Sequence, residues 1–361
     1  MRPDYDDAWI GALVPALLGA EPVEWLPEPV ADADAVVLLV LDGLGWRSLQ
    51  AHRAHLPTLS AMEGRAITAV VPSTTATALT SIATGLAPAE HGVLGYRIRV
   101  GGRVLNVLRW QVAGDEPPAP EQVQPHPPFM GGSVPVVTRA EFRGSGFTGA
   151  HLRGARLVGW RTTSTLCEHV RRTVASGHRF TYAYYDGVDR VAHEYGLRDG
   201  FFARELTAAD QLVDQLLDVL PEHCALVTTA DHGQVHVPVA AQTSLDAVDP
   251  LVAGYSGEGR FRSLHARPGA AAELLAEAGR RFGDLAWVLP RDELFDDGWF
   301  GPRGAAGPIV RGRVGDVVLA ARAETSFLDP TDPGESRMIA RHGSLTADEL
   351  LVPLLAARGR G

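Results

Sequence analysis

The chain of 361 residues contains no lysine, so all 33 of its basic residues are arginine. Acidic residues number 43, and the formal net charge at pH 7 is −10. A balance this acidic argues against a protein that binds nucleic-acid polymers or anionic membranes in general. A chain of this charge that acts on an anionic substrate needs cations at its site, either local arginines or metal ions. We therefore expect no nucleic-acid polymer and no membrane as partner, and the oligomeric state is left open.

Cysteine is almost absent, because the chain has only Cys167 and Cys224, far apart and without the spacing of a metal site. Both are typical of buried free thiols in a reducing compartment, with one disulfide as the alternative. Long apolar runs are absent too, since no stretch reaches the ~18 residues that span a membrane. The first residues carry acids where a signal peptide carries basic residues, so we expect a cytoplasmic protein.

Short apolar runs alternate with helical patterns along most of the chain. AVVLLVLD, RFTYAYYD and CALVTTAD, at residues 35–42, 179–186 and 224–231, have the character of buried strands. Helical spacing predicts helices at 76–83 and 205–220. Strands that alternate with helices predict an α/β fold with a mainly parallel central sheet and helices on both of its faces.

Residues 255–335 interrupt this rhythm with a strand–helix–strand character of their own. RFRSLHAR, LAWVLP and GDVVLAAR are predicted strands, and residues 270–282 are a predicted helix. We interpret the segment as a small α+β lid inserted into a core that is formed by residues 1–254 and 336–361.

The two ends of the chain are predicted to be helical. Apolar residues follow helical spacing over residues 9–18, and a C-terminal helix is expected to contain Leu350, Leu351, Leu354 and Leu355. The segment 114–132 is rich in proline and glycine and predicts a long loop.

Each of the three predicted strands ends in an acid: Asp42, Asp186 and Asp231. Ligands of parallel sheets bind at the carboxyl ends of the strands, so the three acids are candidates for a common site. An aspartate in this position frequently caps a helix, and for any single one capping is the better interpretation. Three such acids together favour a site.

Histidines accompany these acids. His232 follows Asp231 directly, although Asp-His-Gly also makes a turn. Asp189 and His193 are four residues apart, which on a helix places both side chains on one face, suited to a metal ion. The alternative is a surface pair. His342 lies in RHGS, where the alternative is a loop histidine at a turn.

Carboxylates and imidazoles without a thiolate suit zinc, with manganese as an alternative. The set is large enough for two divalent ions: Asp42, Asp189, His193, Asp231, His232 and His342. Two ions a few Å apart can clamp the attacking and leaving oxygens of a phosphoryl transfer. The pattern therefore indicates a hydrolytic site with two metal ions.

The stretch VVPSTTATALTSIATGLAPAEHG, residues 70–92, crowds hydroxyl groups at the start of a predicted helix. Thr75 falls at or near the first turn, where free N–H groups and the helix dipole favour a phosphate. A threonine there can attack phosphorus if a metal lowers the pKa of its hydroxyl. The alternative is a helix cap, a role that we assign to Ser73 or Thr74. The other hydroxyls are expected to pack along the helix: Thr77, Thr80, Ser81 and Thr84.

Taken in order across residues 35–345, these motifs resemble the alkaline phosphatase superfamily, and most of all its type I phosphodiesterase/nucleotide pyrophosphatase branch. The matching elements are VLDGLG, PSTT followed by TGLAPAEHG, Asp189 with His193, the DHG of residues 231–233, and a late HG at His342. Each element is short, but five in register are specific. The predicted lid between DHG and the last HG also resembles the family.

The resemblance implies a metal-dependent hydrolase that cleaves phosphodiester or nucleotide pyrophosphate bonds of a small phosphorylated substrate. The family's nucleophile is the threonine nine residues before the T of TG, which is Thr75 here. The family pattern implies one metal held by Asp42, Asp231, His232 and the Thr75 oxygen, and a second held by Asp189, His193 and His342. Thr75 would form a phosphothreonine, from which water releases the phosphate.

One position departs from the family pattern. Diesterase relatives carry an asparagine a few residues after HG that binds a phosphoryl oxygen, and Tyr96 stands at the matching position here. Asn106 is the only asparagine of the chain, so Asn106 or Tyr96 is expected to replace that donor, with a turn residue as the alternative for Asn106. His91 is expected to close the turn after the nucleophile helix, and His236 to be an exposed loop histidine.

Three other functions stay open. A phosphomonoesterase needs only a change around the non-bridging oxygens. A phosphonoacetate-like hydrolase is close in motif and lid, although its relatives bind the substrate carboxylate with lysines, which this chain lacks. A non-catalytic binding protein would keep the fold, but the presence of every nucleophile and metal position argues against it.

Overall fold

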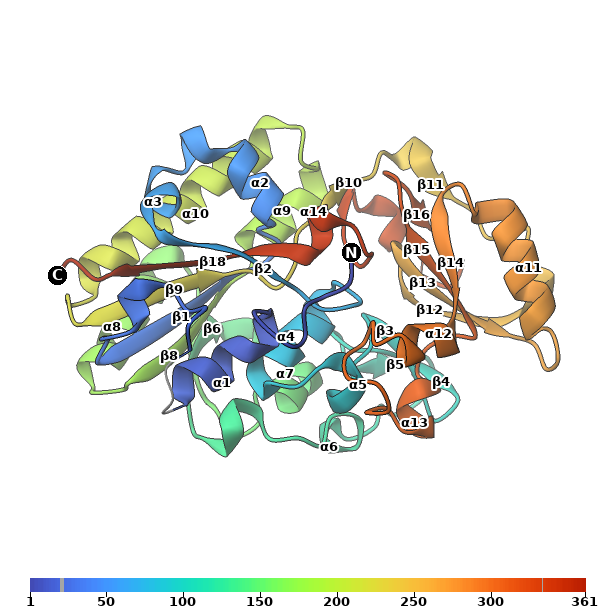
Figure 1. Ribbon diagram of the computed structural model, residues 1–361, viewed down its shortest axis with the longest axis horizontal. Helices are drawn as coiled ribbons and strands as arrows, with labels where there is room; N and C mark the ends of the chain where they lie inside the picture. The colour runs from blue at the N-terminus through green and yellow to red at the C-terminus, as the bar shows by residue number, and fades with distance from the viewer. Residues whose placement is uncertain (20–22, 333) are drawn as a thin grey trace.

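The computed structural model describes residues 1–19, 23–332 and 334–361, and a seven-stranded sheet lies at the centre of its larger part (Figure 1). The strand order is β2-β18-β9-β1-β8-β6-β7. The strands are β1 (Ala35–Leu41), β2 (Glu63–Thr68), β6 (Pro135–Arg139), β7 (Arg156–Trp160), β8 (Phe180–Tyr185), β9 (Cys224–Thr229) and β18 (Leu351–Arg358). The strands from β9 to β7 pair in parallel, and β18 runs antiparallel between β9 and β2.

Helices cover both faces of this sheet. β1, β8 and β9 are buried along their whole length, which is why they form continuous apolar runs. In Figure 1, α2, α3, α9 and α10 lie over one face, and α1, α4 and α7 lie over the other. The helices of this part are α1 (Leu13–Leu18), α2 (Trp46–Ala51), α3 (Pro57–Ala61), α4 (Thr75–Thr84), α5 (Pro88–His91), α6 (Pro120–Val123), α7 (Gly146–His151), α8 (Thr163–Ala175), α9 (Gly187–Tyr195), α10 (Gly200–Val219) and α14 (Ala347–Leu350). The predicted α/β fold with a mainly parallel sheet is confirmed.

Most predicted elements are found within a few residues of their expected bounds. The three predicted strands are β1, β8 and β9, and the two predicted helices are α4 and α10. The N-terminal helical pattern forms a 3-10 turn (Ile10–Ala12) followed by α1, and both pack against α4. The predicted loop 114–132 holds only α6 and another 3-10 turn (Pro128–Gly131).

The predicted C-terminal helix is wrong. Leu350 ends the short α14, whereas Leu351, Leu354 and Leu355 lie in β18. β18 is inserted between β9 and β2, so its middle is buried on both faces. A strand in that position has the same continuous apolar pattern as a buried helix segment, and the sequence alone does not separate the two.

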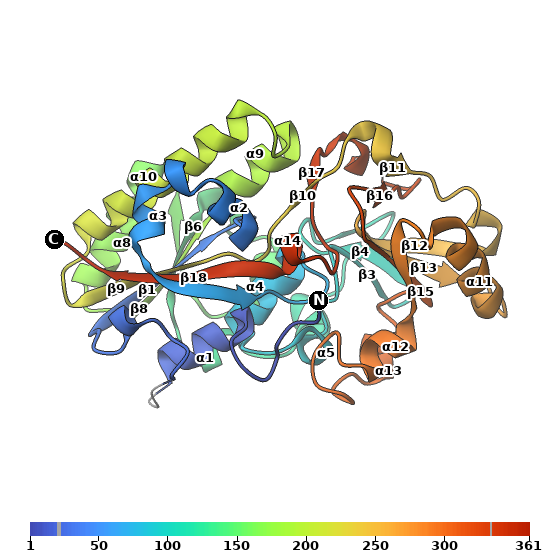
Figure 2. The same cartoon turned by 45° about the horizontal axis from the view of Figure 1, so that its top comes forward.

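A four-stranded antiparallel sheet, β12-β13-β15-β14, is the centre of the smaller part of the molecule. Its elements are β12 (Val252–Glu258), β13 (Phe261–Ala266), α11 (Ala271–Phe282), β14 (Ala286–Pro290), α12 (Arg291–Asp296), α13 (Pro308–Arg311) and β15 (Val317–Ala321). Figures 1 and 2 show α11 on the side of this sheet that faces away from the larger part. Leu264, Leu274 and Leu319 belong to an apolar cluster separate from the main core. The three predicted strands and the predicted helix of this segment are β13, β14, β15 and α11, whereas β12 was not predicted. The lid as a separate insertion, with boundaries at 255 and 335, stays a prediction.

Short strand pairs lie between and beside the two parts. β10 (Val235–His236) pairs with β17 (Ala340–Arg341), and β11 (Gln242–Thr243) pairs with β16 (Ser326–Phe327). These pairs join the segments that enter and leave the smaller part. A further sheet, β3-β4-β5, is formed by β3 (Arg97–Val100), β4 (Arg103–Asn106) and β5 (Gln111–Val112).

The register of the central sheet brings the strand-end acids to one edge. Leu41 pairs with Tyr185 across β1 and β8, and Val40 pairs with Thr229 across β1 and β9. Asp42 and Asp231 therefore emerge side by side, as expected for carboxyl ends of parallel strands.

Two expectations that rested on what the chain lacks can be compared with the structure. Cys167 and Cys224 are both buried free thiols, as predicted. Among the helices in the described ranges, none is long and apolar enough to cross a membrane.

Candidate metal centre

Asp42, Asp231 and His232 form one group of candidate metal ligands at the carboxyl edge of the central sheet. One ligand atom from each lies within 4.8 Å of the others. Nε2 of His232 is 3.5 Å from Oδ1 of Asp42 and 3.4 Å from Oδ2 of Asp231. All three side chains are buried.

Asp189, His193 and His342 meet beside this first group. Asp189 and His193 lie one turn apart on α9, with 3.3 Å between Oδ2 and Nε2. Nε2 of His342 is 3.3 Å from Nε2 of His193 and 3.8 Å from Oδ1 of Asp189. A second set of ligand atoms within 4.8 Å joins Asp189 and His342 to His232, whose ring stacks on that of His342. The structure thus brings all six predicted ligands together, while their binding of metal stays a prediction.

Backbone carbonyl groups orient all three histidines in the same way. Nδ1 of His193 lies 2.7 Å from the Ala340 oxygen, and Nδ1 of His342 lies 3.0 Å from the Ser73 oxygen. Nδ1 of His232 lies 3.1 Å from the Gly233 oxygen. A carbonyl oxygen only accepts, so each Nδ1 carries the hydrogen and each Nε2 presents a lone pair to the cluster. This is the usual arrangement around metal-bound histidines.

The carboxylates of the first group have buried oxygens that lack a partner. Oδ1 of Asp42 and Oδ2 of Asp231 accept no hydrogen bond, whereas the other oxygen of Asp42 accepts from the Tyr184 hydroxyl. Burial, together with the charges of Asp231 and Asp189, raises the pKa of Asp42 well above its ordinary value. Burial raises the pKa of Asp231 as well. A cation between these oxygens would offset the cost of burying them, so this donor set fits a divalent metal ion.

Neighbouring charges shift the pKa values of the second group, which consists of Asp189, His193 and His342, in a different way. Burial opposes ionisation of Asp189, but the nearby histidines, His193 foremost, lower its pKa below the ordinary value. Burial likewise opposes the charged form of His193, but Asp189 raises the pKa of that imidazole. Burial and the charge of His232 lower the pKa of His342 well below its ordinary value. A neutral imidazole with a free Nε2 is the form that binds a metal.

Thr75 is the first residue of α4 and is only 8% exposed. Its Oγ1 lies 3.1 Å from Nε2 of His232, at the border between the two ligand groups. The prediction that Ser73 or Thr74 caps the helix is confirmed in position, because Thr74 is the N-cap residue of α4. Thr74 occupies the N-cap position without a side-chain hydrogen bond to the helix, and the Ser73 hydroxyl donates to the Ser344 oxygen at 2.8 Å. Neither of these hydroxyls is therefore bonded to the N–H groups at the start of α4.

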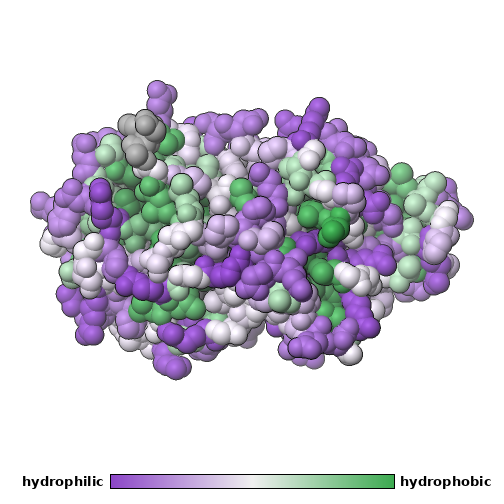
Figure 3. Space-filling model, turned by 90° about the horizontal axis from the view of Figure 1, so that it is seen from below, coloured by the Kyte–Doolittle hydropathy of each residue, from purple (hydrophilic) through white to green (hydrophobic). Residues whose placement is uncertain are grey.

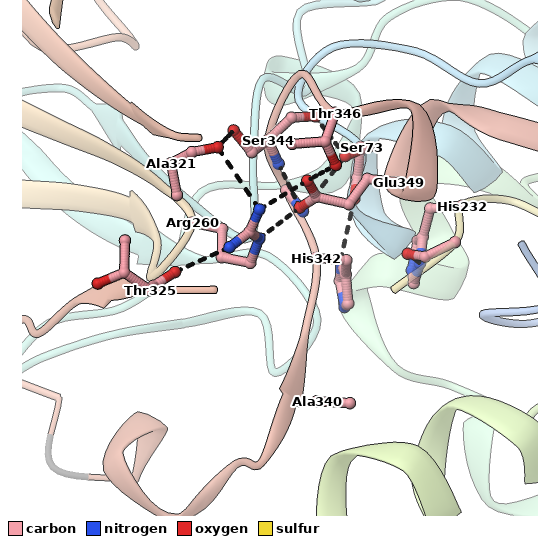
Figure 4. Close-up of polar contacts among 12 residues, drawn as sticks. Ser73, His232, Arg260, Ala321, Thr325, Ala340, His342, Ser344, Thr346 and Glu349 are labelled. Atoms are coloured by element: carbon pink, nitrogen blue, oxygen red, sulfur yellow. Dashed lines mark hydrogen bonds and ion pairs between the residues drawn. The ribbon is translucent and has the colours of Figure 1, made fainter. Parts of the chain in front are cut away.

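A buried network ties the His342 loop to the smaller part of the molecule (Figure 4). Arg260, in the turn between β12 and β13, forms a bidentate ion pair with Glu349 of α14 at 2.7 and 2.9 Å, and neither side chain is exposed. Glu349 also accepts from the Ser344 backbone N–H at 2.9 Å. Ser344 is bonded to Ser73, whose backbone oxygen accepts from His342. The arginine of one part is therefore linked by hydrogen bonds to a candidate ligand of the other.

The same glutamate reaches the Asp-His-Gly turn. The backbone oxygen of Glu349 accepts from the Gly233 N–H at 2.8 Å, next to His232. A side chain at Gly233 would collide with the Asp348 backbone, which explains the glycine. Glu349 thus contacts the loops that carry both His232 and His342.

Two cavities open at the cluster, and both are lined by Thr75 and Asp189. The larger has a volume of about 760 Å³ and an apolar wall that includes Leu79, Phe142 and Phe147. The smaller has a volume of about 320 Å³ and is also lined by His193, His342, Tyr96 and Glu258. The site can therefore hold a reacting group near Thr75 and an organic group beside it.

The two predicted substrate-binding residues lie near the smaller cavity. Tyr96 lines it, and Asn106 donates from Nδ2 to the Tyr96 hydroxyl at 2.6 Å. The Asn106 side-chain oxygen accepts from the Arg109 backbone N–H at 3.0 Å. Both ends of the amide are engaged within the protein, as in a turn residue. Substrate contact by either residue stays a prediction.

Three other residues from the sequence analysis lie away from the ligand groups. Asp186 is paired with Arg139 at 2.5 Å and with Arg190 at 3.6 Å. His91 is buried, lies 2.9 Å from the Ser81 hydroxyl and accepts from the Val93 N–H, so its predicted structural role is confirmed. His236 was expected to be exposed, but it is half-buried in β10, where it accepts from the Leu197 N–H.

Sequence reasoning missed three polar neighbours of the ligands. The Tyr184 hydroxyl donates to Asp42, and the Gln234 amide donates to Oδ1 of Asp189 at 2.9 Å. Their positions gave a signal, since Tyr184 lies two residues before a strand-end acid and Gln234 directly follows DHG. Glu258 gave none, because it comes from β12 of the smaller part.

The chain is similar to one known protein family in sequence and to several solved structures in fold. A family model for type I phosphodiesterase/nucleotide pyrophosphatase matches residues 36–165 and 152–345. The fold is similar to that of murine ectonucleotide pyrophosphatase/phosphodiesterase 5, with a TM-score of 0.67, 13% identity, and coverage of 89% of this chain and 87% of that one. The human protein of the same name gives a TM-score of 0.66 at the same identity and coverage, as does an inactive threonine-to-alanine variant of the murine protein in complex with AMP. No curated protein matches the chain in sequence.

Proposed function

Because this chain belongs to the type I phosphodiesterase/nucleotide pyrophosphatase family, and is a phosphoester hydrolase of that type, we propose that it uses Thr75 as nucleophile at a site with two metal ions. The observation that carries this proposal is the position of Thr75, whose Oγ1 lies 3.1 Å from Nε2 of His232, the residue shared by the two sets of ligand atoms that lie within 4.8 Å of one another. The larger part of the molecule supplies every proposed ligand.

The residues present fit two divalent cations, which we propose to be zinc. Asp42 and Asp231 each aim an unpartnered buried oxygen at the cluster, and each histidine presents Nε2. Bound cations would stabilise charge on the phosphoryl oxygens and favour the alkoxide form of an adjacent hydroxyl. Carboxylates with imidazoles are also acceptable to manganese, so metal analysis decides between the two ions.

The chain's own groups supply the remaining chemistry. The Oγ1 of Thr75 loses its proton and forms a bond to phosphorus while the bond from phosphorus to the leaving oxygen breaks. The leaving alcohol takes up a proton, and the phosphothreonine keeps the other substituent of a diester until water releases it. Water then attacks the same phosphorus, and the Thr75 oxygen leaves. Because Thr75 is the first residue of α4, the free N–H groups at the start of this helix would favour the negative charge of a phosphoryl group bound to it.

The family includes enzymes for diesters and for nucleotide pyrophosphates, and we propose a small substrate of one of these classes. The murine relative was described in complex with AMP, which supports a small nucleotide-like ligand. The apolar wall of the larger cavity supports an organic substituent on phosphorus. A phosphomonoesterase and a phosphonate hydrolase remain the alternatives, and a panel of diesters, nucleotides, monoesters and phosphonates with added zinc or manganese ranks them by kcat/KM.

Replacement of the nucleophile tests the proposal. We expect Thr75→Ala to lower kcat on an aryl phosphodiester by on the order of 10³-fold or more, and to keep the bound metal. Thr77→Ala is the matched control, because Thr77 is fully buried on the same helix and its hydroxyl has no hydrogen-bond partner. A Thr75→Ala enzyme within about tenfold of the wild-type rate would rule out Thr75 as nucleophile.

A further inference from the structure

Arg109 stands where the two cavities meet. Four residues line both of them: Thr75, Leu108, Arg109 and Asp189. Arg109 is the one arginine common to both linings in the described part of the chain. Arg109 is exposed rather than packed into the protein.

The other arginines that line these cavities already have partners. Arg139 and Arg190 share the carboxylate of Asp186. Arg341 donates to the backbone oxygens of Met338 and Glu335. The guanidinium of Arg109, by contrast, has no hydrogen bond or ion pair with any residue in the described ranges. Its five donors are free for a ligand.

The turn that carries Arg109 is held by specific contacts. Asn106 accepts from the Arg109 backbone N–H, and its amide is bonded to Tyr96. Trp110, the next residue, has a φ of 53°, a left-handed conformation that is costly for a bulky side chain. The Trp110 ring lies against Gly146, where a Cβ would come within 2.1 Å of it, and its indole N–H donates to the Pro118 oxygen. These contacts fix the turn in which Arg109 lies.

The negative charge around the two cavities favours an unpaired cationic side chain there. The protein has a net charge of −10, and the carboxylates of Asp42, Asp189 and Glu258 line the two cavities. The proposed metal ions meet the phosphoryl group that reacts, but a second anionic group on the substrate would face these acids. Arginine is suited to such a group, because its planar fork binds carboxylate and phosphate oxygens in pairs.

We infer that Arg109 binds a second anionic group of the substrate, next to the phosphoryl group that Thr75 attacks. The inference rests on the proposed function and makes it more specific. The substrate class is a phosphoester, phosphoanhydride or phosphonate with a neighbouring β-phosphate or carboxylate. Asn106 and Trp110 act as positioning residues for this contact.

Substrates with and without a second anion test the inference. Bis(p-nitrophenyl) phosphate has none, ADP offers a second phosphate, and phosphonoacetate offers a carboxylate. In Arg109→Gln we expect the kcat/KM of the better anion-bearing substrate, relative to that of the aryl diester, to fall by about 10- to 100-fold, mainly through KM. The substrate, ADP or phosphonoacetate, whose relative kcat/KM falls further identifies the group that Arg109 binds. Arg103→Gln, at an exposed arginine of β4 that precedes the turn of Arg109, should leave the ratio as in the wild type.

A binding measurement separates this inference from the proposed function. Calorimetric titration of ADP and phosphonoacetate into metal-loaded Thr75→Ala, with and without Arg109→Gln, should show about 10- to 100-fold weaker binding of one ligand in the double variant. A wild-type protein that cleaves none of the substrates contradicts the proposed function, and the titration still decides on Arg109. Equal binding by the single and double variants, or a kinetic ratio within about twofold of the wild type, would overturn the inference.

Discussion

Glu258 brings a carboxyl from the smaller part of the molecule to the edge of the candidate site. It lines the smaller cavity and is only 7% exposed. One oxygen accepts from the Tyr96 backbone N–H at 2.9 Å, and the other has no hydrogen-bond partner. Burial raises the pKa of Glu258 from its ordinary value of 4.5 to about 8, against the opposing effects of that hydrogen bond and of Arg262.

This shift predicts how the stability of the metal-free protein depends on pH. The native state keeps a proton on Glu258 that the unfolded state releases, so the free energy of unfolding falls as pH rises from about 4.5 to about 8. Glu258→Gln removes this loss. In chelator-treated protein at about pH 9 we expect the variant to be more stable than the wild type by at most a few kcal/mol, with little difference at about pH 4.5.

Denaturant unfolding at the two pH values measures this difference. Glu116→Gln, at an exposed glutamate, is the matched control and should follow the wild type at both. Wild-type and Glu258→Gln curves that stay parallel across the pH range would show that this carboxyl has an ordinary pKa in the folded protein.

At the scale of single residues, the sequence predicted those site residues whose neighbours in the chain form a recognisable pattern. Asp42 and Asp231 end apolar strands, and Asp189 with His193 has helical spacing. Arg109 and Glu258 have no such local signal. Their places depend on how a strained turn and an inserted sheet pack on the core, which is set by contacts between distant segments.

At the scale of elements, the Arg260–Glu349 pair joins the β12–β13 turn, α14 and the loop of His342. The arginine also donates to the Thr325 oxygen at 2.8 Å, so both charges are fully surrounded by partners. A buried pair of this kind need not add net stability, but the loss of one partner leaves an uncompensated charge. Because of where the pair lies, we expect it to hold the His342 loop in place.

Glu349→Gln is expected to lower stability by about 3–5 kcal/mol and to weaken zinc binding by about 10- to 100-fold, because the support behind the His342 loop is lost. Thermal unfolding and zinc titration against a competing chelator measure the two effects. The double variant Arg260→Met/Glu349→Leu should recover most of the stability, because it removes both charges.

A matched control separates metal positioning from general destabilisation. Asp210 is also a buried acid, and it accepts from the backbone N–H groups of Thr58 and Leu59 away from the site. Asp210→Asn should lower the unfolding temperature without changing zinc affinity. If both variants lose zinc affinity in proportion to their stability, the pair has no specific role in placing His342.

Helices and strands were predictable where their hydrophobic pattern lies within their own residues. α4 and α10 carry their periodicity along their own length, and β1, β8 and β9 are apolar runs that end at polar residues. β18 was mistaken for a helix because it is buried between two other strands, and only its partners distinguish it. The pairing of strands from opposite ends of the chain is a property of the assembled sheet.

At the scale of the whole molecule, the protein is acidic, and carboxylates also gather at the candidate site, where a negatively charged phosphate group has to bind. Hydrophilic residues cover most of the face in Figure 3, with apolar residues gathered in smaller patches. Within the site, the charges of Asp189 and Asp231 raise the pKa of Asp42, and the charge of Asp189 raises the pKa of Asp231. Two divalent cations would turn this negative cluster into a site that attracts an anionic substrate.

The overall architecture followed from alternation of strands and helices, which predicted the parallel sheet and its two helical layers. What alternation could not predict is that the turn of the smaller part reaches Glu349 and that its β12 lines a cavity with Thr75. Arg260 and Glu349 are 89 residues apart in the chain, and β12 lies still further from Thr75. The site is therefore a property of both parts, although its proposed ligands come from one.

The central claim is that this cluster holds two metal ions beside Thr75, and anomalous X-ray diffraction at the zinc edge from crystals of the zinc-loaded protein tests it most directly. The account predicts two peaks, one among Asp42, Asp231 and His232, and the other among Asp189, His193 and His342, with Oγ1 of Thr75 next to the first. A cluster without a peak, or peaks bound only by other residues, would contradict it.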